Sequence, residues 1–193
     1  MKVKRTVTVD VDTFKVGDVI KIKLTNGVKV EAMAVKQESW GMIFCLVDCL
    51  PDEYQMNRTN PNEGGYEESD LHKKLNSEIL SLFPAKLKDK MIPFDNGDLF
   101  RLPTEKEIFG ENYYGEDESP DVKRWKPMKK RRNRMTFDGS KGEGLQWYWL
   151  MNKGREQKSF FCDVGTGGSA GRDNADNFFG VRPVFKIANK EET

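Results

Sequence analysis

The chain has 193 residues, of which 37% are hydrophobic and 33% charged, and its 32 basic residues nearly balance its 31 acidic ones. This length and composition are typical of one soluble domain, and the balance of charge argues against a protein that binds nucleic acid through its overall charge. We therefore expect a single domain over residues 1–193, with a β-rich part, a helical part, a charged loop insertion and a final group of strands: 1–50, 69–110, 111–144 and 145–193.

The N-terminus and the cysteines bear on the compartment. The basic start, Met1 to Arg5, leads into alternating residues, so we expect no signal peptide, and no later stretch approaches the roughly 18 apolar residues of a membrane span. Cys45 lies in an apolar run with Cys49 just past it, where buried free thiols are expected. One histidine and three scattered cysteines are a poor zinc ligand set, so neither a metal nor a cofactor is predicted. The expected location is the cytoplasm, of a host or of an infected cell, or a virion.

The first fifty residues predict β-strands. Val3 to Val11 alternate with polar residues, as a strand with one buried face should. Two further runs, Val19 to Leu24 and Val28 to Val35, flank Asn26-Gly27. Because Asn-Gly readily supplies the two positive φ values of a type I′ turn, we expect a β-hairpin here. Trp40 to Leu46 predicts a fourth, more fully buried strand.

Helical signals follow a polar loop. Ser69 is the predicted N-cap of a helix whose apolar side chains fall on one face, and Pro84 ends it. Thr104 and Glu107 make a T-x-x-E capping box, which predicts a brief helix that Gly110 terminates.

Strands return near the C-terminus. Leu145 to Met151 and Ser159 to Val164 are predicted strands, and the glycine-rich stretch from Gly165 to Gly171 is predicted to be a hairpin turn. Val181 to Ile187 is the predicted last strand. Strands first, helices in the middle and strands last indicate an α+β fold whose two ends meet in one sheet.

The C-terminal part also carries a family resemblance. The strand Trp147-Tyr148-Trp149-Leu150, the glycine-rich turn and Gly180-Val181-Arg182-Pro183 resemble an uncharacterised family of bacterial and phage domains that end in a Y-W-L … G-V-R-P pattern. Gly17 to Ile20 and the helix from Ser69 to Phe83 also fit, so the resemblance covers most of the chain except 111–144. The resemblance implies a C-type-lectin-like core, as in formylglycine-generating enzymes and the receptor-binding tip proteins of some phages. Such a core has a mixed or antiparallel sheet, here with N-terminal β-hairpins, one main helix and short helices. The family has no established activity.

Two features depart from these families. Formylglycine-generating enzymes depend on cysteines near the C-terminal end, whereas the last strands here carry only Cys162, which argues against oxidase chemistry. The common family loop after Y-W-L contains Ser-Pro-Gly, and this chain has Met151-Asn152-Lys153-Gly154 instead. The contacts that this loop makes in the family are therefore not expected for residues 151–154 of this chain.

A run of basic residues is the first binding candidate. Residues 123–134 hold eight cations that could bind phosphates while the indole of Trp125 stacks on a base. The structural alternative is a solvated loop whose charge is answered by the acidic piece just before it, residues 111–121. That acidic neighbour would also weaken DNA binding, so an acidic protein surface is the preferred partner of this run. The residues assigned to binding are Trp125, Lys129, Lys130, Arg131 and Arg132.

Two aromatic residues and a polar loop are further candidates. Trp147 and Trp149 share one face of a strand, with Tyr148 on the other, and could stack on a sugar or anchor an interface; core packing is the alternative. The polar loop offers oxygen ligands to calcium without the EF-hand layout, or a contact surface, or simply side-chain to backbone bonds. Its candidate residues are Arg172, Asp173, Asn174, Asp176 and Asn177.

Two single residues carry structural expectations. Arg182, between Val181 and Pro183, is expected to be buried and paired with a carboxylate. His72 lies among lysines on its helix and is expected to be exposed. No serine or cysteine lies in a recognisable nucleophile context, so a histidine-based triad is not predicted.

The leading functional prediction is a non-catalytic binding module related to phage or prophage. It would present loops 111–144 and 165–179 to a protein or glycan partner, with no membrane involved and a homo-oligomer left open. One alternative is nucleic-acid or phosphate binding through 123–134. The other is a carboxylate-based enzyme acting on sugars or nucleotides through Asp163, Asp173 and Asp176.

Overall fold

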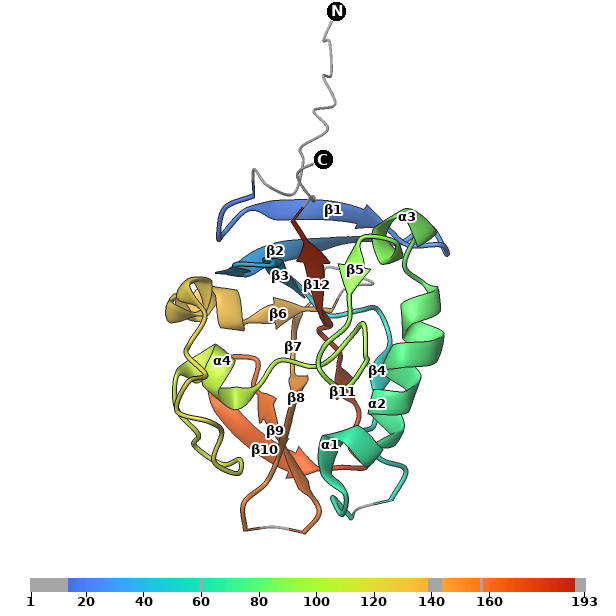
Figure 1. The fold of residues 1–193 in the computed structure, drawn as a ribbon. Coiled ribbons are helices and arrows are strands. Elements are labelled where there is room, and N and C mark those ends of the chain that lie inside the picture. Colours follow the sequence, from blue (N-terminus) through green and yellow to red (C-terminus); the bar gives the residue numbers. More distant parts are fainter. Residues whose placement is uncertain (1–13, 60, 139–143, 157, 190–193) are drawn as a thin grey trace, which may run out of the picture.

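The computed structural model describes residues 14–59, 61–138, 144–156 and 158–189. It confirms the α+β class: the chain forms two curled five-stranded sheets, a two-stranded ribbon and a few short helices (Figure 1). In this view the first sheet lies at the top, the second at the bottom, and the longest helical stretch runs along one side between them.

The first sheet joins strands from the two ends of the described chain. Its order is β1-β2-β3-β12-β5, with every neighbouring pair antiparallel. The predicted meeting of N-terminal and C-terminal strands in one sheet is confirmed, since Phe185 pairs with Phe44. The strand expected over Val3 to Val11 lies outside the described residues. The five strands are β1 (Val19–Lys23), β2 (Lys29–Glu38), β3 (Gly41–Leu46), β5 (Met91–Ile92) and β12 (Val184–Ala188).

The β1–β2 hairpin is confirmed, but its turn is not type I′. Gly27 has a φ of 90°, whereas no described non-glycine residue, Asn26 included, has a positive φ. Leu24 donates to the carbonyl of Val28 at 2.7 Å, which leaves three residues in the loop. The Asn26 side chain accepts a hydrogen bond from the Val28 amide at 3.1 Å. A three-residue loop needs only one left-handed residue, and glycine occupies that place.

The second sheet has the order β10-β9-β8-β11-β4. The expected strand from Leu145 to Met151 is divided at Trp147: β7 (Leu145–Gln146) pairs with β6 (Thr136–Phe137) in the ribbon, and the rest joins the sheet. The glycine-rich turn is confirmed, because the Gly165 amide donates to the Ser169 carbonyl at 2.9 Å and closes the β9–β10 hairpin. The sheet strands are β4 (Glu53–Tyr54), β8 (Tyr148–Lys153), β9 (Phe160–Val164), β10 (Ala170–Asn174) and β11 (Phe179–Gly180).

Local capping chemistry sets the helix ends as expected. The Ser69 hydroxyl accepts from the His72 amide at 3.1 Å, and Thr104 and Glu107 form both bonds of the capping box before Gly110 ends the helix in the left-handed region. The helix that Ser69 caps continues through a π-helical turn. The helical elements are α1 (Gly65–Glu68), α2 (Asp70–Lys74), η2 (Leu75–Ile79), α3 (Ala85–Lys88), α4 (Glu105–Phe109), η3 (Lys126–Lys129) and η4 (Arg131–Arg134).

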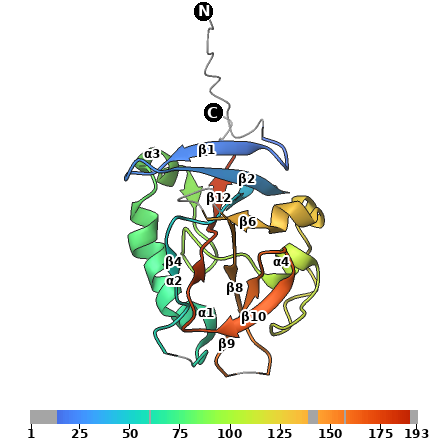
Figure 2. The ribbon, with the colours of Figure 1, turned by 180° about the vertical axis from the view of Figure 1, so that it is seen from behind.

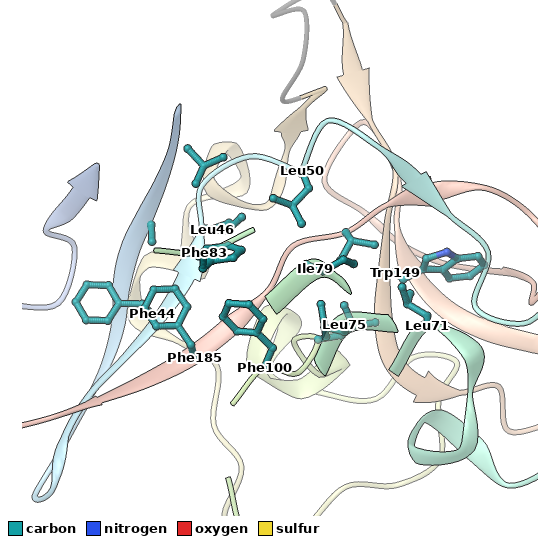
Figure 3. Packing of buried hydrophobic residues seen from close by; sticks show 14 of the residues in the cluster. Phe44, Leu46, Leu50, Leu71, Leu75, Ile79, Phe83, Phe100, Trp149 and Phe185 are labelled. Atoms are coloured by element: carbon teal, nitrogen blue, oxygen red, sulfur yellow. The ribbon is translucent and has the colours of Figure 1, made fainter. Parts of the chain in front are cut away.

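A continuous apolar core links the two sheets through the main helix (Figure 3). Phe44 and Phe185 stack with ring centroids 5.5 Å apart, Phe100 packs edge-on against Phe185, and Leu75 and Trp149 extend the cluster to the second sheet. All five side chains are fully buried. Burial at this density supplies most of the driving force for folding.

A second, smaller core lies around Tyr148, Leu150 and Val184, and two residues of the charged insertion join it. Residues 111–125 contain none of the helices or strands of the described chain, as expected for a loop, whereas η3, η4 and β6 follow them. Trp125 and Met128 are buried in the second core, so the insertion is attached to the fold. Two anchors alone in a polar stretch leave no periodic signal in the sequence. Figures 1 and 2 place η3, η4 and β6 on the side of the molecule opposite α2.

Candidate functional site

The acidic piece before the basic run is engaged elsewhere. Glu116 pairs with Lys153 at 3.1 Å and Asp117 with Arg155 at 2.7 Å, both partners lying in or after β8. Glu118 accepts from the main chain of α4 and from two asparagine side chains. Among the residues that the structure describes, no cation of 123–134 forms an ion pair with a carboxylate. The acidic residues of 111–121 therefore do not neutralise the basic segment 123–134 through ion pairs.

Two arginines attach the basic segment to the glycine-rich turn. Arg131 Nε donates to the carbonyl of Gly167 at 2.6 Å, and Arg134 Nε donates to that of Gly168 at 2.9 Å. Gly168 has a φ of 71°, and a Cβ there would lie 3.0 Å from the Arg131 carbonyl oxygen. Glycine thus permits both the turn and the close approach. The two loops predicted as binding elements consequently form one surface.

The assigned residues of the basic segment divide into an anchor and a surface. Trp125 is only 2% exposed and packs in the second core, so stacking on a base, as the sequence suggested, is not open to it. Its large apolar ring gains more from burial than from a place on a charged surface. The other four, Lys129, Lys130, Arg131 and Arg132, are exposed as expected.

The two tryptophans share a face, as expected, but differ in exposure. Both contact Phe179, with ring centroids 5.5 Å away for Trp147 and 4.5 Å away for Trp149. Trp149 is fully buried and donates its indole N–H to the Tyr54 carbonyl, so its assignment to a contact surface is corrected to core packing. Trp147 is 41% exposed.

An exposed apolar strip continues from Trp147 onto the ribbon. Phe137 and Leu145 are paired across β6 and β7, and both are exposed to a similar extent. Leu145 and Trp147 are two residues apart in the chain, and both are exposed. Sequence reasoning missed this strip because the two ribbon strands are too short to show a pattern.

The polar loop is largely paired with itself. The Asp173 carboxylate accepts from the Asn174 amide at 2.7 Å and from the Asn177 side chain at 2.6 Å. Arg172 lies over the ring of Tyr114 at 5.1 Å. No group of three or more metal-binding side chains occurs within the described ranges, so the calcium hypothesis gains no geometric support. The five candidates Arg172, Asp173, Asn174, Asp176 and Asn177 are partly buried, and their contact role stays a prediction.

The three carboxylates of the enzymatic alternative differ in burial, since Asp163 is buried whereas Asp173 and Asp176 are partly exposed. Asp163 is fully buried, and burial raises its pKa to about 7, with Asp173 and Glu105 adding to the shift. Neither oxygen of Asp163 has a hydrogen-bond partner among the described residues. Asp163, Asp173 and Asp176 line none of the five main surface cavities. The shifted carboxyl is thus not presented to a substrate there.

Arg182 is buried, as expected, but its partners are not carboxylates. Its Nε donates to the Leu46 carbonyl, one Nη to the Tyr148 hydroxyl at 3.1 Å, and the other Nη to the Asn133 carbonyl at 3.1 Å. Its guanidinium also lies 5.2 Å from the centre of the Tyr148 ring. Backbone carbonyls and an aromatic face satisfy several donors of a guanidinium without a second charge. The expected ion pair is therefore wrong for the described part of the chain.

A cavity of about 590 Å³ brings Arg182 together with the basic segment. Arg132, Met135 and Phe137 line it from one side and Met33 from β2, with Arg182 at its wall. The cavity was not predicted, since its lining comes from four separate parts of the chain. The only hint in the sequence was the basic run itself.

The histidine differs from its prediction, whereas the cysteines agree with theirs. His72 is not exposed: its Nε2 lies 2.5 Å from Asp98 Oδ2, and the pair ties the helix to the turn before Phe100. All three cysteines are free and buried, which confirms the expectation for Cys45 and Cys49.

In the described part of the chain, no helix has the length and apolarity to cross a membrane. Comparisons with protein-family models, with curated proteins and with solved structures found no match to this chain.

Proposed function

We propose that this protein is a non-catalytic binding module whose contact surface is the basic segment 123–134 docked on the glycine-rich turn. One observation carries the proposal: two arginines of the segment are fixed to backbone carbonyls, while Lys129, Lys130 and Arg132 stay exposed and unpaired with carboxylates in the described residues. Cations held in place without counter-charges attract an acidic surface and speed its association.

An acidic protein is the partner that these side chains favour. The strip of Phe137, Leu145 and Trp147 lies on the ribbon and strand that follow the basic segment, and interfaces between proteins combine aromatic residues and arginine in this way. Nucleic acid is less favoured because Trp125, the ring within the basic run, is buried. A glycan would have Trp147 to stack on, but the surrounding charge does not favour a neutral sugar.

The C-type-lectin-like core and the relation to phage or prophage domains remain part of this proposal. They are supported by the Y-W-L strand β8 lying beside the G-V-R-P segment, where Gly180 pairs with Tyr148, and by β12 joining the N-terminal strands. A place in the cytoplasm of a host or infected cell is supported by the three free, buried thiols, and a place in a virion by the same resemblance. A homo-oligomer is compatible with the edge strands β1 and β10.

Affinity capture from a bacterial lysate tests the proposal, with nuclease added to remove nucleic acid. The test variant is Lys129→Gln/Lys130→Gln, and the matched control is Lys86→Gln/Lys90→Gln, which removes two exposed charges near α3. We expect a discrete protein to be captured by wild type and control, and to bind the test variant roughly tenfold more weakly. Equal capture by all three proteins would remove the basic segment from the proposal. Recovery of nuclease-sensitive material alone would replace it with nucleic-acid binding.

A further inference from the structure

The buried guanidinium of Arg182 has donors to spare. A guanidinium carries five N–H groups, and the described structure provides acceptors for three of them, from Leu46, Tyr148 and Asn133. One N–H on each terminal nitrogen is left without an acceptor in the described residues, although Arg182 is only 1% exposed. Buried donors left without acceptors are costly, so this geometry suits a ligand that accepts hydrogen bonds.

No carboxylate of the described chain forms a hydrogen bond or ion pair with Arg182. Its three acceptors are two main-chain carbonyls and a phenol, and burial raises the pKa of the Tyr148 phenol, which keeps it neutral. Cys45 and Cys49 also interact electrostatically with Arg182. Burial raises the pKa of both thiols, that of Cys49 to about 12, so they too are neutral. A buried cation with neutral surroundings is unfavourable unless an anion reaches it.

The cavity at this guanidinium can admit such an anion. Arg132, from the exposed basic segment, lines the same space of about 590 Å³, so two guanidiniums border it. The one carboxylate among its described lining residues, Asp48, already accepts a hydrogen bond from the Phe137 amide at 3.0 Å. Guanidiniums bind carboxylates through paired, charge-assisted hydrogen bonds.

Size and lining favour a peptide over a small ion. A small inorganic oxyanion would leave most of a space this large empty, since cavities of roughly 300–1,000 Å³ hold whole small molecules. Met33, Met135 and Phe137 supply apolar walls that an inorganic ion cannot use. An acidic side chain with an apolar neighbour would use both the guanidiniums and these walls.

A second cavity of about 590 Å³ adjoins the first and shares Asp48 and Phe137 with it. Lys21, Lys23 and Lys29 line it together with the carboxylates Glu31, Asp48 and Asp138, so its cations are matched in number by acids. The anion site is therefore confined to the first cavity, where the two guanidiniums lie. We propose that the Arg132–Arg182 cavity binds a glutamate or aspartate side chain of an acidic, partly apolar peptide segment of the partner. This rests on the proposed function and names the partner's chemistry.

Methyl NMR of the full chain tests the site directly. The probe is a short capped peptide that alternates glutamate with leucine, and the controls are the same peptide with glutamine in place of glutamate and inorganic phosphate at matched ionic strength. We expect the glutamate peptide to shift the Met33 and Met135 methyl signals in a saturable way, leaving the core residue Met56 unmoved. The Arg182 Nε–H signal should move with them.

Variants separate this site from general attraction. Arg132→Gln should weaken binding of the peptide roughly tenfold, whereas Lys129→Gln, which removes one charge outside the cavity, should change it less than about twofold. Arg182→Lys keeps the charge but loses the fork of donors, and should bind weakly if it folds. The signals of the wild-type protein decide the question even if that variant does not fold.

Three outcomes would overturn the inference: no saturable shift at Met33 and Met135, equal shifts with the glutamine peptide, or equal shifts with phosphate alone. The two proposals can fail separately. If Lys129→Gln/Lys130→Gln loses the captured protein while the peptide leaves both methionines unmoved, the binding module stands and the carboxylate site falls. If nothing is captured but the glutamate peptide binds selectively, the site stands and its proposed use by a protein partner falls.

Discussion

A Cβ atom on Gly171 would lie 2.4 Å from Oδ1 of Asp163, so the carboxyl of one strand occupies the space above the bare backbone of the next. The two residues are directly paired between β9 and β10. Asp163 is fully buried in this position, and the described residues offer neither of its oxygens a hydrogen bond. Burial without hydrogen-bond partners disfavours the ionised carboxylate, so this position favours the protonated acid.

Asp163→Asn should change how stability depends on pH. Burial, reinforced by Asp173 and Glu105, raises the pKa of Asp163 from 3.8 to about 7, so the folded protein holds this proton more tightly than the unfolded chain does. The free energy of unfolding of the wild type should therefore fall as pH rises from about 4 to about 7 and level off above that. An asparagine does not titrate, so the variant should not lose stability in this way. Its free energy of unfolding should therefore rise relative to that of the wild type by up to about 4 kcal/mol between pH 4 and pH 7.

Urea unfolding at a series of pH values measures this difference. Asp121→Asn, at an exposed position, is the control and should track the wild type to within about 0.5 kcal/mol at every pH. A difference between Asp163→Asn and wild type that stays constant from pH 4 to pH 8 would show that Asp163 is ionised and compensated in the folded state.

Gly171→Ala should be destabilising for a steric reason. Its new Cβ would meet three atoms of the Asp163 carboxyl within 3.2 Å, and forcing atoms into a packed site costs about 1–3 kcal/mol. Asp163→Ala removes all three atoms. The double variant should therefore lose much less free energy of unfolding than the two single variants lose together. Urea unfolding of the four proteins gives the coupling free energy, and additive losses would mean that the strain arises elsewhere.

The elements that the sequence predicted well are those set by neighbouring residues. The Ser69 cap and the Thr104–Glu107 capping box depend on side chains that bond to backbone within three residues, and both are present as expected. The Asn26-Gly27 hairpin also formed. Its turn type differed because the Leu24–Val28 pairing, which sets the loop length, is a property of both strands and not of the dipeptide.

The candidate site was predicted only in part because its geometry is not local. The sequence identified Arg131 and Arg132 as cations, but not that Arg131 would hold the carbonyl of Gly167, 36 residues away. Trp125 was misplaced since a single aromatic residue in a charged run carries no periodicity. The burial of Arg182 was expected, whereas its neutral acceptors come from distant turns and strands that no short pattern brings together.

Arg134→Ala should release the glycine-rich turn. The arginine donates to the carbonyls of Gly168 and Met128 and lies over the ring of Phe109 at 5.5 Å. Losing these contacts should cost about 1–3 kcal/mol. Arg132→Ala, at an exposed position without such bonds, should stay within about 0.5 kcal/mol of wild type.

Hydrogen exchange shows where the effect of Arg134→Ala falls. Amides of residues 165–169 should exchange faster in Arg134→Ala, and at the wild-type rate in Arg132→Ala. Only Arg134→Ala removes a hydrogen bond to the turn. Equal protection of the turn in all three proteins would mean that the β9–β10 hairpin orders it alone, and that the two loops form a joint surface without depending on each other.

The cysteines should be inert to thiol reagents until the protein unfolds. All three are free and buried, and burial raises the pKa of Cys49 from 9.0 to about 12, with its thiol 3.3 Å from the Thr136 hydroxyl. Because the thiolate is the reactive form, its fraction at pH 8 should be on the order of a thousandfold lower than for an ordinary thiol. Ellman's reagent should therefore detect almost no free thiol in the native protein and three in denaturant. Rapid reaction of one thiol in native buffer, identified by mass spectrometry, would mean that its surroundings open often. If that thiol were Cys49, the opening would involve the ribbon, since Thr136 lies in β6 beside the proposed peptide site.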